Sequence, residues 1–240
     1  MQASPEQQSL VLELQLLDNE IMQANTKLKS LPEVEQLLHI DKRIITATDE
    51  VATVKLEADQ ITLELRRGEV DVETVTDRIK KDEVRLASGN ATPKELEQTQ
   101  HEIQTLKKRQ LALEEIELEI MVRSEAVTER SKVLTTDLAS LETLKAEINQ
   151  RLTAATSEIN SLIANKQKDR QAVAVKIEKV LLDLYEKIRT SSGVGAAALV
   201  GNKCNGCNLA INAVEMQRIK TLPLDEVLRC EECRRILVRI

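Results

Sequence analysis

The sequence predicts a mainly α protein in which a long antiparallel coiled-coil hairpin precedes a small C-terminal module. Three observations predict this fold: an apolar heptad repeat over most of the chain, one strong turn signal, and two CxxC motifs near the end. The composition agrees, because 31% of the 240 residues are charged and Tyr185 is the only Phe, Tyr or Trp residue. Aromatic side chains dominate most globular cores, so this composition suits a thin helix pair better than a sphere.

The apolar repeat before the turn steps by three and four residues without interruption. A helix with an apolar repeat of about 3.5 residues must wrap a partner to bury its stripe, which predicts one strand of a left-handed coiled coil. The repeat runs through Leu37, Ile40, Ile44, Ala47, Val51, Val54, Ala58, Ile61, Leu65, Gly68, Val72, Val75, Ile79, Asp82 and Leu86.

An earlier seam has the same steps but a different phase. It consists of Leu10, Leu14, Leu17, Ile21, Ala24, Leu28 and Leu31. Because the phase changes at Pro32, we predict a kink near 32 between helices over 5–31 and 33–87. Ser30 and Glu33 have the spacing of a capping box at this kink.

The turn signal lies at the tip of the predicted hairpin, near 88–93. Gly89 and Asn90 are residue types that adopt the left-handed conformation ending a helix. Thr92 and Glu95 have the spacing of a capping box, with Pro93 at the first helical position. The chain then reverses, so that position i faces roughly position 180 − i and both strands of the coiled coil come from one chain.

The returning helix is expected over 93–189. Its predicted seam is Leu96, Ile103, Leu106, Leu113, Ile116, Ile120, Val127, Leu134, Leu138, Leu141, Ile148, Leu152, Ala155, Ile159 and Leu162, followed after a polar stretch by Val173, Ile177, Val180, Leu184 and Ile188. The hairpin therefore occupies 1–190, and a short flexible joint at 190–195 leads into a second domain at 191–240.

The C-terminal domain is too small to fold on an apolar core alone. We predict a strand over 196–200, a helix over 213–220 capped by Asn212, and a final strand over 236–238. Domains of this size usually need a metal or disulfides to hold them together.

Two CxxC motifs supply that support. They contain Cys204, Cys207, Cys230 and Cys233, and 22 residues separate the two pairs. Four thiolates complete a tetrahedral shell around Zn²⁺, so the motifs predict a C4-type zinc ribbon with one structural zinc and no open position for hydrolysis. The alternative is a redox dithiol or a disulfide pair, although no βαβ pattern accompanies the motifs.

Basic residues of the ribbon support a second functional hypothesis, which is nucleic-acid binding through phosphate contacts. They are Lys203, Arg218, Lys220, Arg229, Arg234, Arg235 and Arg239. These 7 cations face 5 carboxylates in residues 191–240, a net charge of +2 that a zinc ion bound by four thiolates cancels. The simpler interpretation is therefore that the arginines balance the anionic metal centre.

Nothing in the sequence predicts an enzyme or a membrane protein. His39 and His101 have no nearby nucleophile or carboxylate in a catalytic spacing, and both are expected to be solvated helix residues. No apolar run reaches the roughly 18 residues of a membrane helix, and the N-terminus lacks a signal peptide. We expect a cytoplasmic protein whose thiols stay reduced.

The hairpin tip and the cysteine motifs together resemble a known family. The matching segments are Leu86–Gly89, Thr92–Leu96, Gln100–Ile103, Cys204–Cys207 and Cys230–Leu237, and they resemble the bacterial C4-type zinc ribbon, coiled-coil hairpin proteins. Arg234 stands where a glycine commonly follows the last cysteine, and Val238 where an aromatic residue is common. The resemblance implies adaptors or chaperone-like regulators, some linked to an alternative sigma factor, to flagellar or type III secretion components, or to RNA.

The leading functional hypothesis is a non-enzymatic scaffold or chaperone-like regulator that binds protein partners. Its expected contact surfaces are the ribbon and the exposed tip residues Gly89, Asn90, Thr92, Lys94 and Glu95. The alternatives are an RNA- or DNA-binding regulator and a redox protein. We expect a monomer or a weak homodimer, because the hairpin buries its own seam.

Overall fold

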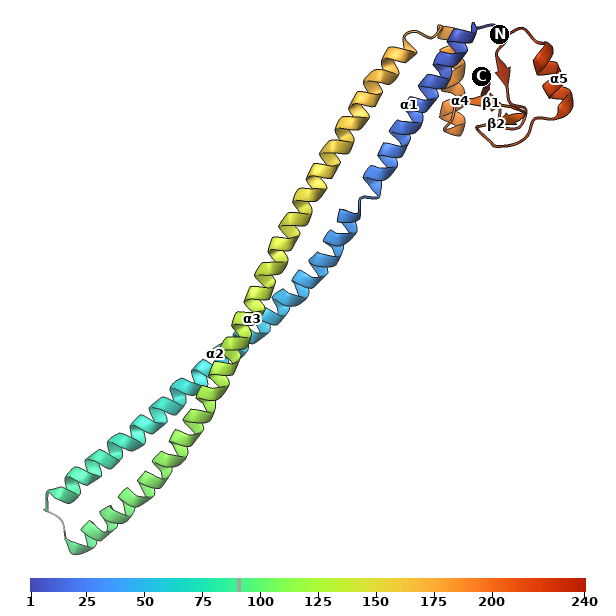
Figure 1. Ribbon diagram of the computed structural model, residues 1–240. Helices are drawn as coiled ribbons and strands as arrows, with labels where there is room; N and C mark the ends of the chain where they lie inside the picture. The colour runs from blue at the N-terminus through green and yellow to red at the C-terminus, as the bar shows by residue number, and fades with distance from the viewer. Residues whose placement is uncertain (90–91) are drawn as a thin grey trace. The chain divides into compact units, whose positions relative to one another are not determined.

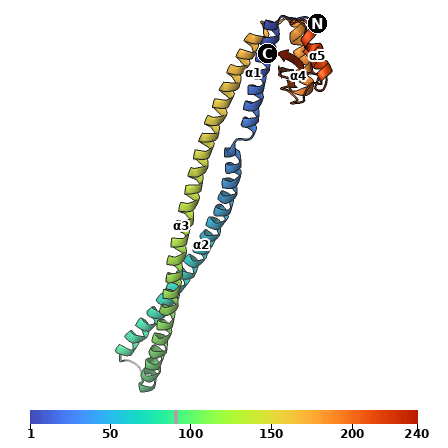
Figure 2. The ribbon, with the colours of Figure 1, turned by 45° about the vertical axis from the view of Figure 1, so that its right-hand side comes forward.

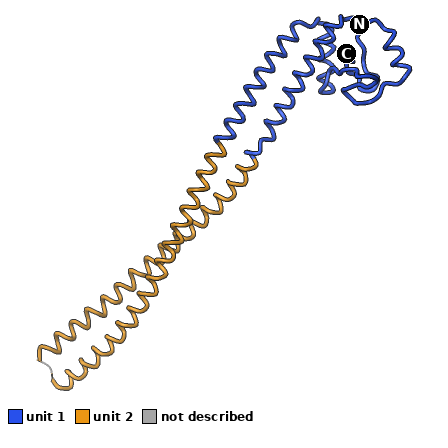
Figure 3. The backbone as a smooth tube through the Cα atoms, viewed as in Figure 1, with its two compact units in different colours: residues 1–34, 150–240 blue, residues 35–149 orange. Residues whose placement is uncertain are grey.

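The computed structural model describes residues 1–89 and 92–240, which form two compact units (Figure 3). Unit 1 comprises residues 1–34 and 150–240, and unit 2 comprises residues 35–149. The described elements are α1 (Pro5–Lys29), α2 (Pro32–Ala87), α3 (Pro93–Ala174), α4 (Lys179–Ser192), β1 (Ala196–Val200), β2 (Lys203–Cys204), α5 (Ala213–Thr221), β3 (Leu228–Arg229) and β4 (Ile236–Arg239) (Figure 1). The predicted class, a mainly α hairpin with a small cysteine-rich C-terminal region, is confirmed.

Unit 2 is an antiparallel pair formed by α2 and α3, which lie side by side in two views (Figures 1 and 2). Every seam residue predicted on α2 is buried or half-buried. Ile40 and Ala47 pack with Leu141 and Ile148. The next cluster joins Val54 and Ile61 to Ile120 and Val127, and the last joins Val75 and Ile79 to Ile103. The antiparallel pairing is as predicted, but its register is displaced: Glu57 pairs with Arg130 and Glu64 with Arg123, so position i faces roughly 187 − i here rather than the predicted 180 − i.

Two residues predicted in the seam of α3 lie outside it. Ile116 is 51% exposed and Leu162 is 48% exposed. The half-buried residues at these points are their neighbours Glu117 and Ile163. A regular heptad continued from the flanking buried residues selects the neighbours, even though one of them is a glutamate.

Ion pairs cross between the helices of unit 2 beside the apolar seam. Lys107 Nζ lies 2.7 Å from Glu83 Oε1, and Arg123 Nη2 lies 2.9 Å from Glu64 Oε2. All four side chains are about half exposed. Exposed pairs contribute at most about 1 kcal/mol each, so they help set the register more than the stability.

The described part of the turn shows the expected capping box. The Thr92 backbone N–H donates to Glu95 Oε2 at 2.8 Å, and the Glu95 N–H donates to Thr92 Oγ1 at 3.4 Å. These donors, the backbone amide first, lower the pKa of Glu95. Gly89 has a φ of +67°, which favours glycine. The predicted tip residue Asn90 lies outside the described residues.

The break between α1 and α2 is not capped as the sequence suggested. The Ser30 hydroxyl donates to the Thr26 carbonyl at 3.1 Å, so Ser30 belongs to the C-terminal end of α1. The predicted Ser30–Glu33 capping box is wrong, because α2 begins at Pro32, which puts Leu31 and not Ser30 at its N-cap position.

The continuous helix predicted over 93–189 is also wrong, because α3 ends at Ala174 and α4 begins at Lys179. The Gln7 side chain of α1 bonds to this break: its Nε2 donates to the Lys176 carbonyl at 2.9 Å, and its Oε1 accepts from the Glu178 N–H at 2.8 Å. The helix α4 then lies beside α1 (Figures 1 and 2). Its buried residues are Leu181, Tyr185 and Ile188, whereas Val180, predicted in the seam, is 68% exposed.

The ribbon contains a four-stranded sheet in the order β2-β1-β4-β3. The predicted strands and helix are present, and the Asn212 side chain caps α5 by accepting from the Glu215 N–H at 2.8 Å. β1 and β4 pair in parallel, with Ala196 opposite Ile236, whereas the two outer pairings are antiparallel. None of the helices in the described ranges has an apolar stretch able to cross a membrane.

Candidate metal centre

The four cysteine sulfurs meet at one point of the ribbon. All four lie within 4.8 Å of one another, with 3.8 Å between the Sγ atoms of Cys204 and Cys233 and 3.9 Å between those of Cys207 and Cys230. A tetrahedral zinc with Zn–S bonds of about 2.3 Å requires sulfurs about 3.8 Å apart. The geometry therefore fits one structural zinc held by four thiolates.

The two CxxC segments have matching backbones. The Asn208 N–H donates to the Cys204 carbonyl at 2.8 Å, and the Arg234 N–H donates to the Cys230 carbonyl at 2.9 Å. Asn208 and Arg234 both have left-handed backbones, with φ of +58° and +62°. Such a position favours glycine, so the turn retains its shape with an arginine at some conformational cost.

The thiols differ in how readily they lose a proton. Burial raises the pKa of Cys204, and it raises the pKa of Cys233 to about 12. The pKa of Cys207 is lowered, chiefly because the Leu209 backbone N–H donates to its sulfur. Zinc binding must therefore displace protons from the buried thiols, which couples metal affinity to pH.

Arg235 joins the two knuckles. Its Nη1 donates to the carbonyl of Gly206, which lies between the first two cysteines. A Cβ at Gly206 would lie 2.8 Å from the Ala197 Cβ and 3.1 Å from the Arg235 Cδ, so only glycine fits without a shift. The Arg235 side chain therefore ties the second CxxC segment to the backbone of the first.

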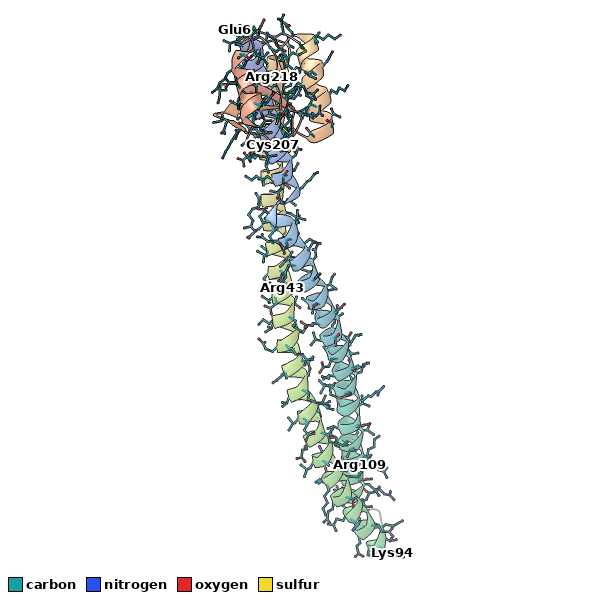
Figure 4. All side chains as sticks on the ribbon, turned by 90° about the vertical axis from the view of Figure 1, so that its right-hand side faces the viewer. Glu6, Arg43, Lys94, Arg109, Cys207 and Arg218 are labelled. Atoms are coloured by element: carbon teal, nitrogen blue, oxygen red, sulfur yellow. The ribbon has the colours of Figure 1, made fainter. Side chains whose placement is uncertain are left out.

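Several other predicted phosphate-binding residues contact protein groups. Arg239 donates to the carbonyls of Leu222 and Pro223 at 3.2 and 2.6 Å, and so holds the loop after α5. Arg218, on α5 (Figure 4), forms two bonds to Glu215, and Arg229 Nε donates to the Arg234 carbonyl at 3.0 Å. The exposed basic side chains without such a contact in the described chain are Lys203, Lys220 and Arg234.

A buried polar group that sequence reasoning missed holds the ribbon against α1. Gln15 is 4% exposed, and its Oε1 accepts from the backbone N–H groups of Gly195 and Ala196 at 2.6 and 3.2 Å. The same oxygen accepts from the Tyr185 hydroxyl at 3.2 Å. The expected flexible joint at 190–195 is therefore wrong, because these bonds fix the start of β1.

Asp18, one turn further along α1, binds the other end of this network. Its Oδ2 accepts from the Tyr185 hydroxyl at 2.7 Å, and its Oδ1 accepts from Arg170 Nε at 2.7 Å. Arg170 also bonds to Glu186 of α4 at 2.5 Å. Gln8, Val11, Gln15 and Asp18 step by three, four and three residues, and this spacing was the available sequence signal.

Tyr185 offers a direct test of this network by alkaline titration. Burial first, and the bond to Asp18 second, raise the pKa of Tyr185 above the usual value of about 10. Since the folded pKa exceeds the unfolded one, the stabilisation is complete below about pH 10 and decreases as the pH rises further. We expect tyrosinate absorbance to appear only together with the loss of helical circular dichroism. A phenol that titrates near its usual pKa while the helices persist would contradict this assignment.

Comparisons with known proteins agree with this geometry. Residues 14–193 match the family model of the CT398-like coiled coil hairpin domain, and residues 203–237 match that of the C4-type zinc ribbon domain. An uncharacterised protein of Mycobacterium tuberculosis is 30% identical over 240 residues, which cover 100% of this chain and 98% of that protein. An uncharacterised protein of Mycobacterium leprae is 23% identical over 90% of this chain and 93% of its own length.

Solved structures share the fold. A structure from Mycobacterium smegmatis has a TM-score of 0.83 and 29% identity, with full coverage of both chains. The structure of CT398 from Chlamydia trachomatis has a TM-score of 0.62 and 19% identity over 98% of each chain, which shows a common fold alone. With most of the sequence matched by one family model and the cysteines matched by another, the chain belongs to the CT398-like coiled-coil hairpin family and carries a C4-type zinc ribbon.

Proposed function

We propose that the protein is a non-enzymatic scaffold that binds protein partners through its ribbon and through the tip residues Gly89, Asn90, Thr92, Lys94 and Glu95. The fixed docking of the ribbon carries this proposal, because Gln15 binds the start of β1 and Tyr185 at once. A ribbon held in one orientation on α1 and α4 presents one defined surface, which lowers the entropy lost on binding. Four thiolates fill the zinc shell, so the metal supports this surface rather than a reaction.

The tip residues differ in how freely they can contact a partner. Thr92 and Glu95 bond to each other in the capping box, whereas the exposed Lys94 lies at the start of α3 (Figure 4). Lys94 is therefore the side chain to alter, because its replacement leaves the cap intact. On the ribbon, the corresponding exposed side chains without a contact in the described chain are those of Lys203, Lys220 and Arg234.

Affinity capture from the native host tests the scaffold. We compare the wild type with Lys94→Glu and with the triple variant Lys203→Glu, Lys220→Glu and Arg234→Glu. The exposed Lys108→Glu on α3 serves as a control. We expect each test variant to lose partners that the control retains, with different losses for the tip and the ribbon. Identical partner sets for all variants would refute contact through these surfaces.

Nucleic-acid binding by the basic ribbon residues stays a prediction. Fewer residues are now candidates for phosphate contacts, because several of the arginines bond to protein groups. Arg235 and Arg239 hold backbone carbonyls, so their replacement would confuse lost binding with lost structure. The triple variant described above leaves both sets of carbonyl contacts in place. RNA or DNA binding should fall steeply with salt and weaken in the triple variant, and a lack of binding at low salt would end this alternative.

We infer a cytosolic location from the cysteine chemistry. The four thiols are free cysteines gathered around one position, an arrangement that binds zinc only while the sulfurs stay reduced. A reducing compartment maintains that state.

A further inference from the structure

The helix α2 carries a second apolar stripe within unit 2. Leu38, Ile45, Leu56, Leu63 and Val70 are each more than half exposed, and the exposed Ala52 continues their spacing. At about 100° per residue, these side chains lie within an arc of about 40°, on the side of α2 opposite its buried seam. Exposed apolar residues that recur at this spacing on one side of a helix have the pattern of a second coiled-coil seam, in which Lys42, Asp49, Asp59 and Arg66 alternate with them.

We propose that a second copy of this chain covers the stripe, with the two α2 helices antiparallel about a two-fold axis. In the register that we infer, Leu38 faces the partner's Leu63 and Ile45 faces the partner's Leu56. The two-fold axis repeats each contact, so four apolar pairs form, with charged positions between them and Asp49 facing the partner's Ala52 near the centre. The intramolecular seam with α3 stays intact, because it lies on the other side of α2.

Charge complementarity selects this partner and this register. Lys42 faces the partner's Asp59, and Glu35 faces the partner's Arg66, so opposite charges meet along the apolar core. Lys42, Asp59, Glu35 and Arg66 are exposed, and their side chains form no ion pair within the described chain. Association would therefore pair these charges without breaking existing contacts.

Neighbouring registers are less favourable. In one neighbouring register, shifted by seven residues so that Leu38 faces the partner's Val70, like charges meet. Lys42 then faces the partner's Arg66, and Asp49 faces the partner's Asp59. A shift of one heptad the other way places Asp49 against the partner's Ile45. A register shifted by a further seven residues in the first direction again brings opposite charges together, but it places the apolar Leu38 against the partner's Asp77. A parallel pair in register sets Lys42 and Asp49 each against its own copy, and like charges at a helix interface are destabilising.

Sedimentation over a wide range of concentrations, with the zinc-loaded full chain, tests this dimer. We expect the average mass of the wild type to rise from one copy towards two, and Leu56→Lys to prevent that rise. Leu118→Lys, at a similarly exposed position on α3, is the control and should associate like the wild type. Circular dichroism checks that each variant keeps its helices.

A charge exchange tests the register. Lys42→Glu and Asp59→Lys each replace two attractive contacts by two repulsive ones, which should weaken association roughly tenfold. The double variant restores opposite charges and should associate like the wild type. A wild type that stays monomeric at every concentration, or a double variant no better than the single ones, would overturn the proposal.

Discussion

Removal of zinc should unfold the ribbon while the hairpin of unit 2 stays helical. Cys204 and Cys230 are themselves part of the small ribbon core, which also contains Ala197, Leu199, Ile219, Leu228 and Leu237. Without the metal, nothing joins the four thiols across that core. The binding of structural zinc typically contributes about 10–16 kcal/mol to folding at neutral pH. The coiled-coil seam of unit 2 contains none of these residues, so it should not respond.

Chelation under reducing conditions provides the measurement. Hydrogen exchange should show loss of protection in β1 and β4, with unchanged protection in α2 and in the part of α3 within unit 2. The far-ultraviolet circular dichroism should change little, because most helical residues lie outside the ribbon. A ribbon that keeps its protection after complete loss of zinc would contradict the structural role of the metal.

Cys204→Ser identifies the ligand directly. Loss of one of four thiolates should weaken zinc binding by more than about 100-fold, a larger effect than loss of an outer contact. Asn205→Ala is the matched control, because this neighbouring side chain is exposed and bears no ligand. Elemental analysis should find one zinc per wild-type and control chain. Thiols that cycle between oxidised and reduced forms while the metal stays bound would instead support the redox alternative.

The sequence predicts those features whose causes are local. The CxxC spacing predicts the metal ligands because two residues are the length a knuckle needs to bring two sulfurs to one ion. Asn212 and Glu215 likewise predict the cap of α5, and the heptad of α2 predicts its buried side, because each pattern recurs within one or two turns. Ile116 shows where a heptad assignment fails. The seam position is occupied by the polar Glu117, and the sequence pattern assigns the apolar residue beside it to the seam instead.

The base of the hairpin could not be predicted in the same way, because its causes lie far apart in the chain. The break after Ala174 contains no glycine or proline, and Gln7 bonds to it from more than a hundred and sixty residues away. The parallel pairing of β1 with β4 is equally non-local. Gln15 and Asp18 are polar residues of α1 whose burial depends on the ribbon and α4, so the local sequence does not show it.

Asp18→Ala should destabilise unit 1 by about 3 kcal/mol. The side chain of Asp18 is 8% exposed and binds Arg170 Nε and the Tyr185 hydroxyl, each at 2.7 Å. Its removal takes one carboxylate from a partly buried guanidinium and leaves the Tyr185 hydroxyl only its longer contact with Gln15, and breaking one side of a buried pair is strongly destabilising. Arg170 keeps its bond to Glu186, which places the expected loss at the lower end of the range for such pairs.

Glu20→Ala is the matched control on the same helix. Glu20 also pairs with α3, at 2.7 Å from Lys166 Nζ, but its side chain is 50% exposed, so its loss should cost less than about 1 kcal/mol. Tyrosine fluorescence during urea unfolding measures both variants, because Tyr185 lies within the network and no other Tyr or Trp contributes. Equal midpoints for the two variants would mean that burial adds nothing to the Asp18 contacts.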